Sequence, residues 1–310
     1  MLRSLEKTTL CAYLRGWKKF ADWCGEHQIG YGNLSVTSVC SFLIYLFQMG
    51  LQVSTLNVIR SGLSFFLSPL FDVGEDPHVK RIFRFFWRKR PVFPRFRVTW
   101  DVSQVLTYLS SLHPPSSLSL KFLTLKALTL LAICSSDRAQ TLESIDIEHS
   151  EVTADAIYFP IYTLLKCSKR NRKVTVVKCV KFEESELDVS LYVTSYLQRT
   201  LALRIRSVRQ GLPKPRQLFL SYFTGKPLRR ASIAKYLLDT LSLAGIDTSC
   251  FRAHSTRGAL PSVMARKGCS PHVILEQGDW KRLGTFQRYY NKPSDTSVEG
   301  RLIARVVNSD

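Results

Sequence analysis

Apolar residues recur every three or four positions along most of this chain, and one segment breaks the pattern. The first run places Leu10, Leu14, Trp17 and Cys24 on one side of the chain, at the spacing of an amphipathic α-helix. Between residues 156 and 180 the sequence instead becomes β-branched and aromatic around a basic stretch. Such a segment is typical of antiparallel strands joined by a turn. The chain is therefore predicted to be mainly α-helical with one small antiparallel β-sheet.

Capping residues mark where several of the helices begin. Ser35 is expected to cap a helix that ends at Gly50, Ser54 to cap the next, and Asp101 and Ser270 to cap later ones. The remaining helices are expected near residues 10–24, 78–90, 125–134, 191–204, 232–243 and 255–267.

Pro261 interrupts the last of these predicted helices, four residues after Arg257. Proline removes a backbone N–H and kinks a helix unless it lies in the first turn. Pro261 would fit in the first turn if the helix begins near Ala259.

A proline-containing segment divides the chain. The sequence RPVFPRFRVTW carries prolines at positions 91 and 94 and shows no helical period, as expected for an extended connection. A chain of 310 residues is long enough for two domains that each bury a core. We predict a helical domain at 1–90, a linker at 91–99 and a second domain at 100–310.

The charge of the chain is strongly basic. Lys and Arg number 44 against 24 Asp and Glu, a formal net charge of +20, which predicts a polyanionic partner. No acid lies between Pro77 and Trp100. The basic residues there are Lys80, Arg81, Arg84, Arg88, Lys89, Arg90, Arg95 and Arg97. An ordinary solvated face is one interpretation, but their mixing with Phe and Trp favours a surface that contacts DNA phosphates. A second basic set, in the predicted β-turn, comprises Lys169, Arg170, Arg172 and Lys173.

Several other functions are disfavoured by the sequence. No apolar run is long enough to cross a bilayer and the first residues lack a signal-peptide core, so we expect a soluble, intracellular protein without membrane contact. The eight cysteines have no zinc-ligand spacing and are expected to be reduced and mostly buried. Asp146, Glu148 and Glu151 are interpreted as scattered surface acids, so no metal site is predicted.

His254 and Arg257 are the first residues with recognisable chemistry. They are three positions apart at the start of a predicted helix, so both side chains can reach one face. A guanidinium binds two phosphate oxygens as a fork, and an imidazole transfers protons near neutral pH. The pair suits a phosphodiester, although H-x-x-R alone occurs in many unrelated proteins.

The residues that follow make the pattern specific. Trp280 comes after a second predicted helix, and Thr285, Phe286, Tyr289 and Tyr290 follow it. In order and spacing, the series resembles the C-terminal signature of the tyrosine recombinase (phage integrase) family. The resemblance implies a helical, SAM-like core-binding domain before the catalytic domain of the DNA breaking-rejoining enzymes.

The same resemblance implies two site residues further upstream. The family's first arginine opens a helix after a long apolar one, which matches Arg138 in LLAICSSDRAQ; Asp137 stands where many members carry a small or apolar residue. The family's lysine lies in the β-hairpin, which matches Lys166, with Lys169, Arg172 and Lys173 as rivals.

A narrower resemblance concerns the nucleophile. Segments such as QLFLSYFTGKPL and GDWKRLGTFQRYYNKP look like the recombinases of DIRS-type retrotransposons and Crypton-like elements, over roughly residues 90 to 295. In that subgroup Trp280 replaces a histidine, and its local string makes Tyr290 the nucleophile. Counting from Trp280 in the wider family points to Tyr289 instead.

The family chemistry assigns a role to each residue. Arg138 and Arg257 would hold the phosphate, His254 would transfer the phenol proton, Trp280 would position the phosphate, and Lys166 would protonate the leaving 5′-oxygen. The resemblance implies no metal and no cofactor, double-stranded DNA as the partner, and four protomers in a synapse. If the host is eukaryotic, we expect nuclear localisation; otherwise the protein is expected in the cytoplasm. An apolar set in the tail, from Val298 to Val307, suits docking on a neighbour or packing on its own domain.

Three other functions remain open. A domesticated or inactive recombinase would keep DNA binding without strand transfer, and the net charge fits it equally well. A type IB topoisomerase would share the chemistry without a partner site. A basic helical interaction protein would require the ordered matches to arise by chance.

Overall fold

The structure is a computed structural model that describes residues 5–91, 97–165 and 174–294. The chain divides into two compact units, Met1–Phe93 and Pro94–Asp310, and the division falls inside the predicted linker. The end of that linker belongs to the second unit, because Thr99 is 4% exposed and its N–H donates to the Pro293 carbonyl at 2.8 Å. None of the described helices is long and apolar enough to cross a membrane.

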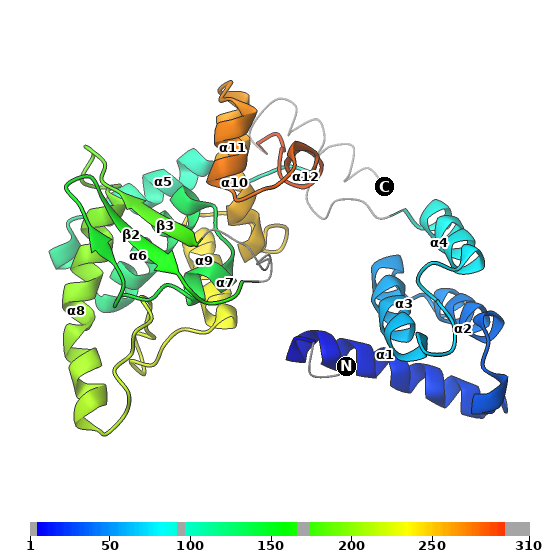
Figure 1. Ribbon diagram of the computed structural model, residues 1–310. Helices are drawn as coiled ribbons and strands as arrows, with labels where there is room; N and C mark the ends of the chain where they lie inside the picture. Colours follow the sequence, from blue (N-terminus) through cyan, green and yellow to red (C-terminus); the bar gives the residue numbers. More distant parts are fainter. Residues whose placement is uncertain (1–4, 92–96, 166–173, 295–310) are drawn as a thin grey trace. The chain divides into compact units, whose positions relative to one another are not determined.

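The first unit is a small helical bundle (Figure 1). Its helices are α1 (Lys7–Glu26), the 3-10 turn η2 (Tyr31–Asn33), α2 (Val36–Gln48), α3 (Val53–Leu67) and α4 (Pro77–Lys89). Ser35 caps α2 as predicted, by accepting the Ser38 N–H at 3.3 Å. The predicted cap at Ser54 is wrong: α3 begins at Val53, after Gln52.

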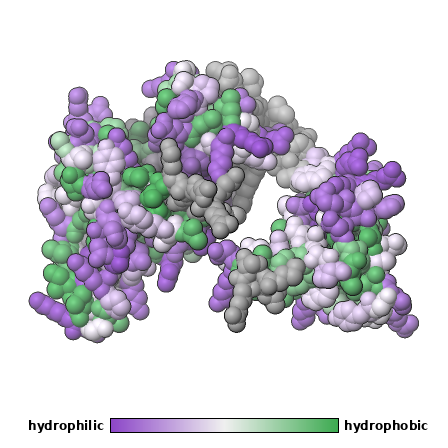
Figure 2. Space-filling view, viewed as in Figure 1, coloured by the Kyte–Doolittle hydropathy of each residue, from purple (hydrophilic) through white to green (hydrophobic). Residues whose placement is uncertain are grey.

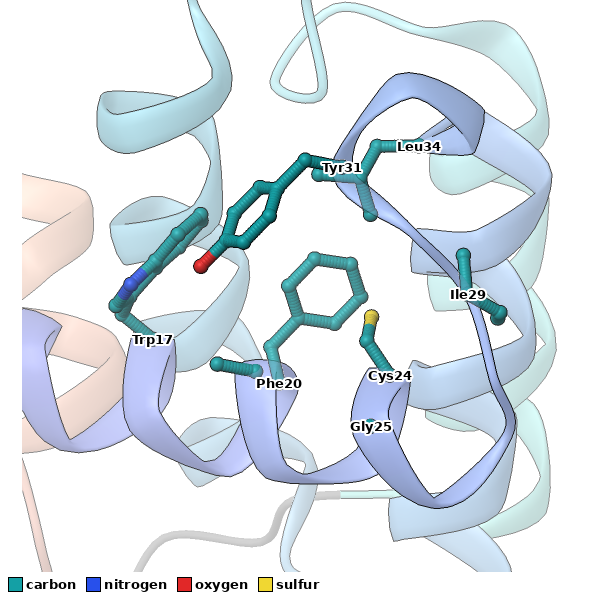
Figure 3. Close-up of a pocket in the computed structure, with 8 residues that line it drawn as sticks. Trp17, Phe20, Cys24, Gly25, Ile29, Tyr31 and Leu34 are labelled. Atoms are coloured by element: carbon teal, nitrogen blue, oxygen red, sulfur yellow. The ribbon is translucent and has the colours of Figure 1, made fainter.

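Glycine lets two helices of this unit approach closely. A Cβ at Gly62 of α3 would lie 3.1 Å from the Tyr13 Cα of α1, so only glycine fits without a shift. Between α1 and η2 lies an apolar pocket of about 140 Å³, lined by Trp17, Phe20, Cys24 and neighbours (Figure 3). Ligand sites usually measure about 300–1,000 Å³ and carry convergent polar groups. This pocket is therefore not the candidate functional site.

The second unit is built around one buried helix. Its elements are α5 (Val102–Ser111), η3 (Pro115–Ser117), α6 (Leu120–Ser135), α7 (Ala139–Glu143), β1 (Glu151–Val152), β2 (Ala156–Ile161), β3 (Thr175–Val180), α8 (Val189–Arg209), α9 (Arg230–Leu243), η4 (Ala253–Ser255), α10 (Thr256–Arg266), α11 (Pro271–Gln277) and α12 (Leu283–Tyr289). Every residue from 123 to 133 of α6 is buried, which explains why its sequence is apolar on all sides. Helices α8, α9 and α10 and strand β3 pack around it (Figure 1).

The predicted antiparallel sheet is confirmed, with a short third strand that the sequence did not indicate. Its strand order is β1-β2-β3, and β2 pairs with β3 from Ala156↔Val180 to Ile161↔Thr175. The mainly helical fold class is likewise confirmed. Asp101 caps α5 and Ser270 caps α11, as predicted.

The predicted helix at 255–267 is confirmed, but Pro261 does not lie in its first turn. Helix α10 begins at Thr256, directly after η4, so Pro261 lies inside it rather than in its first turn. Proline has no N–H to donate to the carbonyl four residues earlier, which here belongs to Arg257. Arg257 is nevertheless the second residue of the helix.

Candidate active site

Tyr290 and His254 meet although 36 residues separate them. The Tyr290 hydroxyl lies 3.2 Å from His254 Nε2, and the rings cross at 63° with centroids 5.9 Å apart. His254 lies in η4, and Tyr290 is the C-cap residue directly after α12. A phenol at this distance from an imidazole nitrogen can transfer its proton directly.

Contacts on both sides hold this pair in place. Trp100 is fully buried and donates from Nε1 to Ser255 Oγ at 2.9 Å, which fixes η4 beside His254. On the other side, Ser262 Oγ lies within hydrogen-bond distance of the Gly258 and Tyr290 carbonyl oxygens and shares its one proton between them. Residue 258 must be small, because a Cβ there would lie 3.0 Å from Tyr290 Cδ1.

Arg257 lies next to the Tyr290–His254 pair. Its side chain is 2% exposed, and Nη2 donates to the Gly278 carbonyl. The guanidinium carbon lies 5.1 Å from the Trp280 ring centre and 5.7 Å from that of Tyr290. Arg257 therefore joins α10 to the segment that carries the tyrosine.

Arg138 brings a second positive charge to the same place. It precedes α7 and follows Ser136, which adopts the left-handed conformation (φ 54°). Its charge acts on both His254 and Arg257. Loss of solvation, followed by the charges of Arg257 and Arg138, lowers the pKa of His254 below its usual 6.5. His254 is consequently neutral at pH 7 and has a ring nitrogen free to accept a proton.

Trp280 packs against the Tyr290 ring. It is 7% exposed, and its ring lies 4.8 Å from that of Tyr290 and 5.2 Å from that of Phe286. Among the described residues, Trp280 Nε1 and Arg257 Nε are buried donors without a hydrogen-bond acceptor. Buried donors are nearly always satisfied, since leaving one unpaired costs about 1–3 kcal/mol. Their presence together indicates that an acceptor belongs in this site.

Gly278 is a site residue that the sequence analysis missed. A Cβ at this position would lie 1.9 Å from Trp280 Cζ3, although the backbone (φ −103°) suits any residue. Asp279 follows it in the left-handed conformation (φ 47°). The glycine of the Gly-Asp-Trp sequence was visible, but its contact with the Trp280 ring was not.

We expect Gly278→Ala to displace the Trp280 ring and to lower the free energy of unfolding by about 1–3 kcal/mol, the usual cost of overpacking. Urea titration measures this loss. Gly284→Ala is the matched control, because Gly284 lies in α12 with nothing within 4 Å of an added Cβ. Equal stability of both variants would contradict the described packing of Trp280.

Asp137 is the other neighbour whose importance the sequence did not reveal. Burial raises its pKa to about 6, while a hydrogen bond to Ser135 and the Arg257 charge act in the opposite direction. Asp137 therefore brings a carboxyl close to Arg257 that can change charge within the physiological range. Its place directly before Arg138 was the only sign of this in the sequence.

Tyr289, the rival nucleophile, makes none of the contacts described above. Tyr289 is 53% exposed, and within the described part of the chain its side chain has no hydrogen bond or ring contact. Lys166, together with its rivals Lys169, Arg172 and Lys173, lies outside the described residues, as do Arg170 and Arg95. The structure thus brings together Arg138, His254, Arg257, Trp280 and Tyr290.

The predicted basic surface on α4 needs two corrections. Arg90 is not available to DNA: its guanidinium donates to the Phe47 and Leu51 carbonyls at 2.6 and 3.2 Å and stacks on the Phe47 ring. Lys80 is neutralised by Glu75, whose carboxylate lies 2.5 Å from its Nζ, because the loop before α4 turns back onto the helix. The remaining basic residues of this helix are exposed: Arg81, Arg84, Arg88 and Lys89.

The acids expected to be scattered are in part clustered. Ligand atoms of Asp146, Glu148 and His149 lie within 4.8 Å of one another. Arg216 pairs with Asp146 at 2.8 Å and with Glu148 at 2.6 Å. An arginine that already neutralises both carboxylates explains the cluster without a cation.

Comparisons with known proteins identify the family and the fold. The family model described as the phage integrase family matches residues 103–295. The fold resembles the XerH site-specific recombinase bound to its difH substrate before cleavage (TM-score 0.62, 13% identity, covering 96% of this chain and 79% of that one). It also resembles a lambda integrase dimer bound to a COC′ core site (TM-score 0.56, 13% identity, 95% and 92%).

A third similar structure is the integrase of transposon Tn1549 in complex with transposon right-end DNA (TM-score 0.56, 12% identity, covering 99% of this chain and 95% of that one). No curated protein matches the chain. The family match spans more than half of the sequence and includes Arg138, His254, Arg257, Trp280 and Tyr290. This chain therefore belongs to the phage integrase family and is a tyrosine recombinase.

Proposed function

We propose that the chain cuts and rejoins double-stranded DNA through a covalent 3′-phosphotyrosyl link at Tyr290. The observation that carries this proposal is the 3.2 Å contact between the Tyr290 hydroxyl and a His254 ring held neutral beside two arginines. A phenol has a pKa of about 10 and must lose its proton as it attacks. A neutral imidazole at this distance is suited to take it.

The other residues act on the phosphate. Arg257 and Arg138 would hold its non-bridging oxygens and stabilise the charge that develops during attack. Trp280 Nε1, a buried donor with no acceptor in the described part of the chain, would position the same group. Lys166 is proposed, from the family resemblance, to protonate the departing 5′-oxygen.

The atoms balance in both directions. The Tyr290 oxygen bonds to phosphorus as the bond from phosphorus to the 5′-oxygen breaks, and the departing oxygen takes a proton. A 5′-hydroxyl of another strand then reverses the step and releases the tyrosine. The phosphoester is conserved throughout, so we propose a reaction that needs neither nucleotide nor metal.

We propose that residues 1–90 act as a DNA clamp and that 100–310 form the catalytic domain. The similar structures are of recombinases bound to DNA, among them a lambda integrase tetramer on a Holliday junction (TM-score 0.54). By analogy, four protomers would assemble on two DNA sites. The local string around Tyr290 supports a recombinase of a mobile element of the DIRS or Crypton type, which would act in the nucleus of a eukaryotic host.

A trapping experiment tests the function. The protein is incubated with nicked duplexes that carry a randomised core, so that cleavage releases a short fragment and rejoining is blocked. We expect a protein–DNA adduct that survives SDS and is destroyed by protease. Stable DNA binding without any adduct would favour the inactive, DNA-binding alternative. Relaxation of supercoiled plasmid without sequence preference would favour the topoisomerase alternative.

The pH dependence of adduct formation follows from the lowered pKa of His254. The neutral ring persists to lower pH than in an ordinary histidine, so the rate should stay level from pH 8 to 7 and fall only below 6.5. Single-turnover rates across this range measure the midpoint. Asp137, with its pKa raised to about 6, could give a similar fall, so Asp137→Asn is the control. A midpoint above 6.5, or one that disappears in Asp137→Asn, would contradict the role of His254.

A further inference from the structure

Helix α4 exposes two aromatic rings among its basic residues. Phe85 is 50% exposed and Trp87 is 43% exposed, on a helix whose surface is otherwise hydrophilic (Figure 2). Large aromatic side chains bury 150–250 Å² each when they find a partner, and they dominate the energetics of interfaces. Two such rings on one short helix therefore indicate a contact surface.

The two rings border the basic stripe of the helix. With about 100° per residue, Arg81, Arg84 and Arg88 fall within about 60° of one another. By the same geometry, Trp87 lies at one edge of this stripe and Phe85 at the other. The opposite face is buried in the core of the unit through Val79, Phe83 and Phe86.

The rings differ in how they are supported. Phe85 lies 6.2 Å from the ring centres of both Phe47 and Phe86, so one of its faces packs on the unit. Trp87 has neither a ring contact nor a hydrogen bond within the described residues. It is therefore the freer of the two to contact a partner.

We propose that Trp87, at the edge of the stripe, contacts thymine methyl groups in the major groove of the DNA. This inference rests on the proposed function, and it names the part of α4 that gives sequence preference. The major groove accommodates one α-helix, and the thymine C5-methyl is the apolar group that it displays. Arginines on the stripe would contact phosphates, which position a helix without reading sequence.

Charge favours DNA over a protein as the partner of this face. Arg81, Arg84, Arg88 and Lys89 have no ion pair in the described residues, and the helix contains no acid. Phosphates supply the opposite charge at regular spacing along a duplex. Contact with a protein is the alternative that the experiment below separates.

The test is a cycle of two changes, one in the protein and one in the DNA. Fluorescence anisotropy measures binding of the parent and of Trp87→Ala to a mixed-sequence duplex, and to the same duplex with every thymine replaced by uracil. Uracil lacks only the C5-methyl group. We expect Trp87→Ala to weaken binding to the thymine duplex about 5- to 50-fold at each salt concentration, with an unchanged salt slope.

The uracil duplex should weaken binding by the parent but not by Trp87→Ala. Two control variants sharpen the result. Arg84→Ala should lower the salt slope by about one and keep the preference for thymine, whereas Phe223→Ala, which removes an 82% exposed ring from the second unit, should change neither quantity.

Each other outcome has a distinct meaning. If Trp87→Ala binds both duplexes as the parent does, or keeps the thymine preference, the inference is overturned and a protein contact explains the exposed ring. If the parent itself does not bind duplex DNA, the proposed function fails instead. Thermal unfolding of each variant confirms the fold, which these exposed substitutions should leave intact.

Discussion

Tyr290→Phe is expected to abolish the covalent protein–DNA adduct, a loss on the order of 10⁴-fold or more, because no other group can take the place of the attacking oxygen. The ring, its packing against Trp280 and the contacts around Gly258 all remain in this variant. DNA affinity and thermal stability should therefore match those of the parent. SDS gels on the nicked duplex measure the adduct, and anisotropy measures the affinity.

Tyr289→Phe is the matched control for this variant. It removes the same oxygen one residue earlier, from a side chain that is 53% exposed and has no hydrogen bond within the described residues. We expect it to form adduct within about threefold of the parent rate, as for a surface substitution. Loss of the adduct in Tyr289→Phe with retention in Tyr290→Phe would make Tyr289 the nucleophile, as the wider family's spacing predicts.

Arg257→Met should lower the rate of adduct formation by about 10²- to 10³-fold, the usual cost of removing one donor that stabilises developing charge. Methionine fills much of the volume of the arginine stem but offers no hydrogen bond. Arg257→Lys keeps the charge without the planar fork, so we expect it to recover only a small part of the rate. Single-turnover kinetics on the nicked duplex separate the three proteins.

A structural effect must be distinguished from this catalytic one, since Arg257 is buried and bonded to the Gly278 carbonyl. Urea unfolding and DNA affinity report on the fold. Arg288→Met, on the exposed side of α12, is the control for loss of a positive charge near the site. A normal rate in Arg257→Met would remove Arg257 from the mechanism.

The sequence predicted those parts of the site that depend on local spacing. His254, Arg257 and Trp280 follow one another at intervals set by helices, and helix periods and caps are readable from residue types. Ser35, Asp101 and Ser270 were recognised as caps for the same reason. Tyr290 over Tyr289 rested on a local string, and the contact with His254 now supports it.

The parts that the sequence missed depend on contacts between distant segments. Gly278 is required because the Trp280 ring covers its Cα, and Trp100 matters because it bonds to Ser255 across 155 positions. Arg90 was grouped with the DNA contacts because composition does not show which arginines bond to carbonyls of their own unit. Tertiary contacts of this kind are not encoded in any local pattern.

The most direct test of the mechanism is to locate the DNA attachment by mass spectrometry. Trypsin cuts after Arg288 and Arg301, and Lys292 is protected by Pro293, so both tyrosines fall in one peptide and its fragment ions must decide between them. The mechanism predicts a nucleotide phosphate on the Tyr290 oxygen. Attachment at Tyr289, or a purified adduct that carries the phosphate on neither tyrosine, would contradict it.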